Sequence, residues 1–455
     1  MKTDLVITGR LVLPEGMVDG GWLAVSDGRI AAIGTGDHPG ASDRFDAGEA
    51  LVLPGVIDGQ THATSYGGLA GIESTTRSAV AGGVTTIVDK PYDNPEPLFD
   101  IARFEAKREA VESLSHCDMA LYATVMPDQK LDVVPELAAA GIAAFKISSF
   151  ESSPTRFPRI PADQTLALLE ALAGTDLPLG LHNEDQEIVR AGIALCRAQG
   201  RDGIAAHSDS RPEAAELAAT AQFLALGAAA GAHAHIVHLS TGRGFELVEQ
   251  NRRQGMRATG ELCVHYLWFD PDVDGPDLGA LMMVNPPIRP NARTALWDAV
   301  RQGRVAFISS DHASWPVDNK RANSIFEAGP GVPGLETLLP AFHTGAAAQG
   351  LDAAGMTARM LSEAPARFFG LWPRKGAIRI GADADLAVYA ADPVTWDATN
   401  AHDELRWSPF HGRHFDGRVI RSYVRGRLAW DGTDIVNNPG DGSFTPRGVG
   451  GWFAD

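Results

Sequence analysis

Six residues whose side chains can bind a metal ion or move a proton follow apolar runs of this sequence. They are Gln60 and His62 in PGVIDGQTH, Lys146 in AFKISS, His182 in LHNED, His238 in HIVHLS and Asp311 in SSDHAS. Imidazole and carboxylate groups without thiolates suit Zn²⁺ or another borderline divalent ion. Three or four such groups on a rigid rim leave one coordination position open for water. A lone histidine is more often structural, so the prediction of a metal site depends on the whole set.

Eight apolar, strand-like runs position these residues, and they alternate with segments of helical period, including 98–113, 161–174, 211–231 and 291–303. The alternation is typical of parallel β–α–β units. Polar residues stand at the carboxyl end of the runs, where barrel enzymes place their chemistry because the loops there converge on one pocket. We therefore expect a (β/α)₈ barrel. Its strands are predicted at 53–62, 84–91, 119–125, 142–149, 177–185, 234–240, 256–265 and 305–312.

The sequence pattern at both ends of the chain predicts short strands separated by turns. Asp27-Gly28 is predicted as a hairpin turn between two alternating runs. Neither end has enough strands for a stable sandwich, so we expect the two ends to pair with each other. The predicted fold class is α/β, a TIM barrel of residues 53–372 with a small β-sandwich domain formed by residues 1–52 and 373–455.

The chain resembles the amidohydrolase superfamily, and within it the cyclic amidohydrolases allantoinase, hydantoinase (dihydropyrimidinase) and dihydroorotase. Further matching stretches are GGVTTIVDKP, GELCVHYL, NPPIR, GVPGLE and KGAIRIGADADLAVYA, so the likeness runs in order over nearly the whole chain. The family fold is a metal-bearing barrel flanked by a β-sandwich from both termini. The resemblance implies hydrolysis of a C–N bond in a small cyclic amide, imide or ureide.

Relatives commonly hold two metal ions bridged by a carboxylated lysine. The resemblance implies that Lys146 is this lysine, carboxylated on its amino nitrogen, and that His182 and His238 bind the second metal. Asp311 would be a ligand of the first metal and the general base, and His62 the second member of the metal-binding His-x-His pair. The implied cofactor is Zn²⁺, one or two ions per chain, or another divalent metal in its place.

Gln60 replaces the first histidine of that pair. A glutamine oxygen is neutral, harder and a weaker donor than imidazole, so the first site should lose affinity for zinc. Three outcomes stay open: a two-metal centre with a glutamine ligand, a single-metal centre, or an inactive structural homolog. With one metal, Lys146 would remain an unmodified ammonium. Because five of the six positions are kept, we favour an active enzyme.

Five further residues are predicted to bind the substrate: Asn285 in NPPIR, Ser149 in KISSFESS, His265 in CVHYL, and Lys90 and Asn94 in DKPYDNPEP. Relatives use Asn285 or its backbone to bind the ring. Ser149 either stabilises the oxyanion or is a loop serine bonded to backbone. His265 more often orients a ligand or packs. Lys90 either neutralises a substrate carboxylate, compensates for a missing metal, or is a surface lysine.

Residues at two positions narrow the class of substrate. Thr64 stands where dihydroorotases carry the arginine that holds the substrate carboxylate, and Glu151 stands where hydantoinases carry a tyrosine. The segments KISSFESS, HSDSRPEAAE and SPFHGRHFDGRVI are closer in character to allantoinases. A mononuclear hydrolase or deaminase on the same barrel is the other enzyme alternative, which Lys146 and NPPIR disfavour.

The amino-acid composition excludes several other classes of protein and of site. The 57 acidic residues outnumber the 39 Lys and Arg, and the net charge of −18 argues against a nucleic-acid surface. Three cysteines without a CxxC pair indicate neither a disulfide framework nor a thiolate zinc site. The sequence predicts no membrane span and no signal peptide, so we expect a cytoplasmic protein. The resemblance implies a homotetramer or homodimer.

Overall fold

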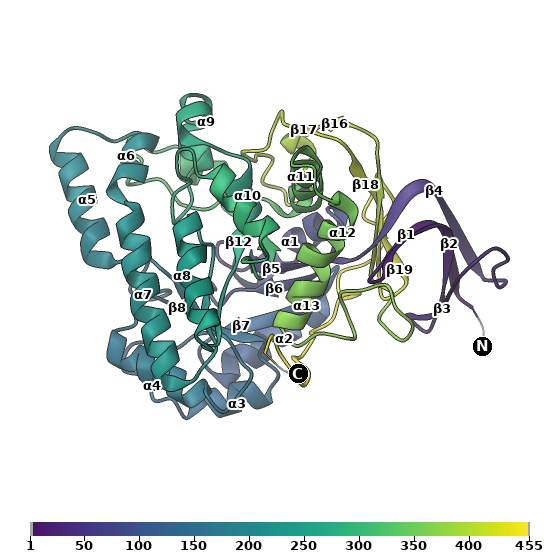
Figure 1. Ribbon diagram of the computed structural model, residues 1–455, viewed down its shortest axis with the longest axis horizontal. Coiled ribbons are helices and arrows are strands. Elements are labelled where there is room, and N and C mark those ends of the chain that lie inside the picture. The colour runs from purple at the N-terminus through teal and green to yellow at the C-terminus, as the bar shows by residue number, and fades with distance from the viewer. Residues whose placement is uncertain (1–2, 454–455) are drawn as a thin grey trace.

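The computed structural model describes residues 3–453, and within them a closed ring of parallel strands forms the core (Figure 1). The strands follow one another in chain order, and β14 pairs with β5 through His312 and Thr61 to close the ring. All eight predicted runs form this barrel. Its strands are β5 (Val56–His62), β6 (Val84–Asp89), β7 (Asp118–Ala123), β8 (Ala144–Ser148), β9 (Leu179–His182), β10 (Ala234–Ile236), β11 (Ala258–Gly260) with β12 (Leu262–Cys263), and β13 (Ile308–Ser309) with β14 (His312–Ala313).

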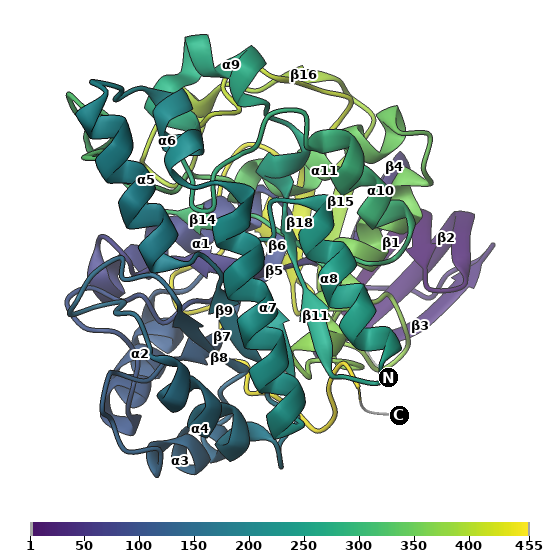
Figure 2. The ribbon, with the colours of Figure 1, turned by 60° about the vertical axis from the view of Figure 1, so that its left-hand side comes forward.

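Helices surround the barrel, and Figure 2 shows α5, α7 and α8 lying across its outside. The four helical segments predicted from the sequence are α2, α4, α7 and α10. α7 ends at Gly231, whose φ of 67° lies in the left-handed region that glycine adopts without strain. The helices are α1 (Gly71–Ala81), α2 (Ile101–Leu114), α3 (Val133–Ala139), α4 (Ala162–Leu172), α5 (Gln186–Ala198), α6 (Ile204–Ser210), α7 (Glu213–Ala230), α8 (Gly242–Arg253), α9 (Pro271–Leu278), α10 (Arg293–Arg301), α11 (Leu335–Ala348), α12 (Ala353–Ala358) and α13 (Ala364–Phe368).

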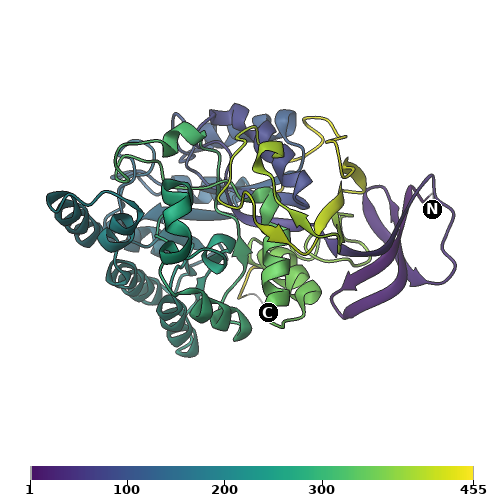
Figure 3. The ribbon, with the colours of Figure 1, turned by 90° about the horizontal axis from the view of Figure 1, so that it is seen from above.

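A second sheet joins both ends of the chain, which confirms the predicted fold class. β15 pairs with β4 through Leu386 and Pro54, so the C-terminal strands extend the N-terminal ones (Figure 3). The turn at Asp27 and Gly28 connects β2 to β3, and both residues have positive φ, as a tight hairpin requires. This sheet contains β1 (Leu5–Leu13), β2 (Gly16–Ser26), β3 (Arg29–Thr35), β4 (Asp43–Pro54), β15 (Leu386–Ala390), β18 (Arg418–Val424) and β19 (Arg427–Trp430).

The C-terminal segment 438–453, which the predicted division assigns to the β-sandwich, runs along the barrel. The Met119 N–H donates to the Ser443 carbonyl at 2.9 Å, and the Thr445 N–H donates to the Met119 carbonyl at 2.7 Å. Phe444 packs edge-on against Phe104 of α2, with ring centroids 5.3 Å apart. The segment therefore covers the start of β7, opposite the strand ends that carry the predicted site. None of the helices within residues 3–453 is both long and apolar enough to cross a membrane.

Candidate active site

A cavity of about 370 Å³ lies at the carboxyl ends of the barrel strands. Six of the predicted residues line it: His62, Lys146, His182, His238, Asn285 and Asp311. Three of them lie in strands β5, β8 and β9, and the other three lie in segments that follow or connect strands. Gln60 is fully buried on the same strand as His62. The structure thus brings the six metal-site candidates and Asn285 to one place.

The imidazoles of His182 and His238 form the first pair of possible metal ligands. His182 Nδ1 and His238 Nε2 are 3.0 Å apart. Two nitrogens bound tetrahedrally to one zinc ion at 2.0–2.1 Å would be about 3.3 Å apart, so little movement is needed to receive an ion. Burial, then the neighbouring His182, lowers the pKa of His238 far below its ordinary value. His238 is therefore neutral, as a ligand must be.

His62 and Asp311 form the second pair, with His62 Nε2 3.5 Å from Asp311 Oδ1. Burial lowers the pKa of His62 to about 4. Burial opposes charge on Asp311, but His62 and the nearby His238 and Lys146 together hold the pKa of Asp311 below its ordinary value. The backbone of Asp311 has a φ of 50°, and that of His238 a φ of 41°. Such conformations are uncommon outside glycine and often occur at active sites.

Gln60 is directed at Asp311 through its amide nitrogen. Gln60 Nε2 donates to Asp311 Oδ1 at 2.6 Å. The opposite orientation of the amide would place an oxygen against the carboxylate, so the hydrogen bond fixes which way it points. Gln60 Oε1 is buried without a hydrogen-bond partner among residues 3–453. That oxygen is the atom that remains for a ligand.

Lys146 is the central residue of β8 and lines the same cavity as these pairs. Its side chain is buried, and burial lowers the pKa of its amino group. A neutral amine is the form that reacts with carbon dioxide, and a buried lysine reaches it more readily than an exposed one. A divalent ion accepts all the donors found here, which are three imidazoles, one ionised carboxylate and the unpartnered Gln60 oxygen. The residues present therefore fit a metal ion.

Glu184 and Arg211 hold His182 in place, and neither was predicted from the sequence. Glu184 Oε2 lies 2.9 Å from His182 Nε2 and 2.5 Å from Arg211 Nη1. Burial opposes charge on Glu184, but Arg211 and His182 hold its pKa below the ordinary value. The carboxylate keeps the proton on Nε2, so Nδ1 presents its lone pair to the cavity. The spacing of Glu184 two residues after His182 was the signal available in the sequence, whereas nothing there points to Arg211.

Four predicted substrate-binding residues do not line the cavity: Ser149, Asn94, His265 and Lys90. The Ser149 hydroxyl donates to the His182 carbonyl at 2.8 Å, which is the backbone role considered as its alternative. Asn94 Nδ2 donates to the Tyr66 carbonyl at 2.8 Å. His265 is buried in the protein, and Lys90 lies inside the barrel with none of its surface exposed. The interpretation of Lys90 as a surface lysine is therefore wrong.

Aromatic residues form one wall of the cavity, a feature that the sequence analysis missed. Tyr92 and Phe157 lie with ring centroids 4.2 Å apart, and Trp315 completes the wall. Tyr92 also meets His62 edge-on at 5.7 Å. Arg156 Nη2 donates to the Tyr92 carbonyl at 3.0 Å and so fixes the loop that carries this ring. An apolar surface therefore stands directly beside the metal-site residues.

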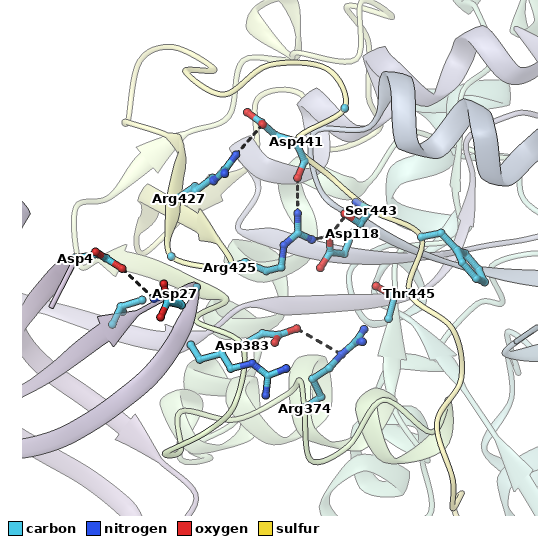
Figure 4. A pocket seen from close by; sticks show the side chains of 16 residues that line it. Asp4, Asp27, Asp118, Arg374, Asp383, Arg425, Arg427, Asp441, Ser443 and Thr445 are labelled. Atoms are coloured by element: carbon cyan, nitrogen blue, oxygen red, sulfur yellow. Dashed lines mark hydrogen bonds and ion pairs between the residues drawn. The ribbon is translucent and has the colours of Figure 1, made fainter. Parts of the chain in front are cut away.

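A larger cavity of about 710 Å³ lies at the other end of the barrel, against the β-sandwich (Figure 4). Three of its arginines are paired with carboxylates. Arg425 bonds to Asp118, Arg427 Nη1 lies 3.1 Å from Asp441 Oδ1, and Arg374 lies 3.4 Å from Asp383. Of the other charged residues that line it, Asp4 accepts from the Asp27 N–H and Arg29 donates to the Gly381 carbonyl.

Three carboxylates next to this larger cavity form a cluster of possible metal ligands, Asp118, Asp383 and Asp385. The ammonium of Lys375 occupies its centre, at 2.6 Å from Asp118, 2.5 Å from Asp385 and 3.3 Å from Asp383. Lys375 is fully buried, so this cluster is a structural ion network between the barrel and the β-sandwich rather than a metal site.

Known proteins resemble this chain over nearly its whole length. Residues 51–429 match the sequence model of the amidohydrolase family. The chain is 36% identical to an allantoinase of Rubrobacter xylanophilus over 98% of both proteins, and 31% identical to an L-hydantoinase of Paenarthrobacter aurescens over 98% of both. The solved L-hydantoinase from Arthrobacter aurescens superimposes with a TM-score of 0.93 at 29% identity, covering 98% of this chain and 100% of that one. A D-hydantoinase structure gives a TM-score of 0.89 at 29% identity, covering 98% and 99%.

Proposed function

Because the chain belongs to the amidohydrolase family, in its cyclic amidohydrolase branch, we propose that it is a metal-dependent hydrolase that opens a cyclic amide, imide or ureide at a ring C–N bond. The observation that carries the proposal is the meeting of two ligand pairs, His182 with His238 and His62 with Asp311, at the floor of one cavity. When bound, a divalent ion lowers the pKa of a coordinated water toward ~7 and polarises the substrate carbonyl. We propose Zn²⁺ as that ion.

Three residues at the cavity are the proposed ligands of the metal ion. His182 and His238 would hold the metal ion through the facing nitrogens, and Lys146, carboxylated on its amino group, would be the third ligand. Glu184 keeps His182 in the ligating tautomer. Asp311 lies next to these groups, and its lowered pKa keeps its carboxylate ionised.

Asp311 moves the proton in the proposed reaction. As the water oxygen bonds to the carbonyl carbon, Asp311 accepts a proton from that water. It then gives the proton to the ring nitrogen as the C–N bond breaks, so the carboxylate is restored. The hydrogen bond from Gln60 holds the Asp311 carboxylate in the orientation that both transfers need. Asn285 Oδ1, buried in the cavity wall and without a partner among residues 3–453, accepts an N–H of the substrate ring.

The aromatic wall narrows the substrate class to rings with an apolar substituent, such as 5-aryl or 5-alkyl hydantoins. Tyr92, Phe157 and Trp315 offer apolar surface to a group attached to the ring. The ureido group of allantoin would find hydrogen-bonding groups only in Ser65, Ser152, Ser153 and Arg156, which also line the cavity, and would bury little apolar surface against the three rings. The structure thus supports a hydantoin with an aromatic substituent over allantoin itself, although the resemblance pointed to allantoinases.

A substrate panel tests this proposal. We expect kcat/KM for 5-benzylhydantoin to exceed that for allantoin by roughly 10-fold or more, since pocket contacts of this size are worth about 1–3 kcal/mol. Trp315→Ala should lower kcat/KM for 5-benzylhydantoin more than for unsubstituted hydantoin, which serves as the matched control. A preference for allantoin would reject the proposed apolar substituent on the substrate but would still agree with the proposed ring-opening reaction. No turnover of any cyclic amide in the panel would reject the function.

The predicted homotetramer or homodimer and the predicted cytoplasmic location come into this proposal from the resemblance to cyclic amidohydrolases. The acidic composition supports the location alone, because a net charge of −18 favours a protein that stays dissolved and away from nucleic acids.

A further inference from the structure

Arg156, on the loop between β8 and α4, lines the active-site cavity without a carboxylate partner. Residues 3–453 place no carboxylate oxygen within 4.0 Å of its guanidinium. Nη2 donates to the Ser65 carbonyl at 2.6 Å and to the Tyr92 carbonyl at 3.0 Å, which uses two of the five guanidinium N–H groups. Nε is buried without a hydrogen-bond partner among the same residues, and Nη1 has no acceptor there either. The cavity therefore contains a cation whose hydrogen-bonding capacity is only partly used.

The positive charge of Arg156 is not balanced by a neighbouring acid, unlike that of two other arginines at this end of the barrel. Arg211 pairs with the buried carboxylate of Glu184 at 2.5 Å, and Arg289 pairs with that of Glu216 at 2.8 Å. Burial lowers the pKa of Arg156, but an arginine remains charged at neutral pH. A ligand with a carboxylate would give Arg156 the kind of partner that the chain supplies to the other two.

The ring of Tyr92 relates the guanidinium to the metal-site residues. Tyr92 meets His62 with ring centroids 5.7 Å apart, and Arg156 Cζ lies 5.4 Å from the centroid of the same Tyr92 ring. Phe157, the residue after Arg156, packs on Tyr92 with ring centroids 4.2 Å apart. A substituent that lies along this wall therefore begins beside His62 and, after the length of one aromatic ring, comes within reach of the guanidinium.

We propose that Arg156 is a specificity-determining residue that binds a carboxylate on the substituent of the substrate ring. The inference rests on the proposed function for the reaction and names the substrates more closely, as cyclic amides whose aromatic substituent ends in an acid. Tyr92 and Phe157 contact the aromatic part, and the unused N–H groups of Arg156 donate to the carboxylate. The hydrogen bonds to Ser65 and Tyr92 hold the guanidinium in place before the substrate arrives, so little side-chain freedom is lost on binding.

Two substrates that differ in one charge test the inference. 5-(4-Carboxybenzyl)hydantoin carries a carboxylate where 5-(4-carbamoylbenzyl)hydantoin carries a neutral amide of similar shape. In the wild type we expect kcat/KM for the acid to exceed that for the amide by about 10-fold or more, as is usual for hydrogen bonds to a charged group. Arg156→Met should abolish this preference, because methionine offers neither a charge nor a donor. Arg156→Lys should restore part of the preference, because lysine keeps the charge with fewer donors.

Arg159→Met is the matched control on the same loop. Arg159 pairs with Glu187 at 2.8 Å on the surface and does not line the cavity, so its removal should leave the preference for the acid unchanged. Absence of that preference in the wild type would overturn the proposal. An equal fall in kcat/KM for both substrates in Arg156→Met would also overturn it, because a residue that only holds the Ser65 and Tyr92 carbonyls predicts that result. The wild-type preference decides the question if Arg156→Met does not fold, which circular dichroism would show.

The test separates this inference from the proposed function. If the protein opens neither ring, isothermal titration calorimetry of the same protein measures the Kd of the two compounds. Tighter binding of the acid, lost in Arg156→Met, would support this inference and reject the proposed function. Ring opening without a preference for the acid would do the reverse.

Discussion

Replacing Asp311 by Asn should lower kcat for ring opening by about 10²–10⁴-fold, the range usual for loss of a general base. Asparagine is close to aspartate in shape, but its amide can neither accept the proton of the attacking water nor give it to the leaving nitrogen. The loss should appear in kcat because proton transfer occurs in the transition state. The measurement is kcat for hydantoin with metal-loaded protein.

Two controls separate loss of the base from loss of the site. Metal content and the thermal melting temperature of Asp311→Asn should be determined in parallel, because Asp311 also lies next to His62. Asp298→Asn changes an exposed aspartate on α10 and should leave kcat unchanged. If the folded, metal-containing Asp311→Asn protein kept the wild-type kcat, another group would have to be the base.

Lys375→Met should lower the free energy of unfolding by about 3–5 kcal/mol, the usual result of removing one partner from a buried ion network. The Lys375 ammonium lies among the carboxylates of Asp118, Asp383 and Asp385. Methionine has a similar length but no charge, so these buried carboxylates would lose their common counter-ion. The measurement is urea denaturation at neutral pH.

Arg321→Met is the matched control for this effect. Arg321 pairs with Asp318 at 3.0 Å on the surface, where both side chains are largely exposed. Its removal should change the free energy of unfolding by less than about 1 kcal/mol. Equal effects of the two substitutions would show that the Lys375 network does not join the barrel to the β-sandwich in the way inferred.

The barrel and the metal-site residues could be predicted from the sequence because both follow from a local pattern. A continuous apolar run that ends in a polar residue indicates a buried parallel strand, and the strand ends share one face of a barrel. His182, His238 and Asp311 all follow such runs, so their meeting in one cavity required only the count of strands. The pairing of the two chain ends followed from the lack of enough strands at either end.

The orientation of individual side chains could not be predicted in this way. A surface position was one alternative for Lys90, but its side chain is fully buried inside the barrel, whereas the preceding Asp89 pairs with Lys107 of α2. Serines of a loop are equally suited to a substrate and to backbone, and Ser149 bonds to backbone. The partners Arg211 and Trp315 come from distant loops whose paths depend on tertiary packing rather than on local pattern.

Metal dependence of ring opening tests the central claim most directly. The protein is treated with a chelator, dialysed, assayed with hydantoin and 5-benzylhydantoin, and assayed again after Zn²⁺ is added. The account predicts that ring opening disappears with the metal and returns with it. Ring opening at the same rate by the metal-free protein would contradict the account, and absence of ring opening from the metal-loaded protein would favour an inactive structural homolog.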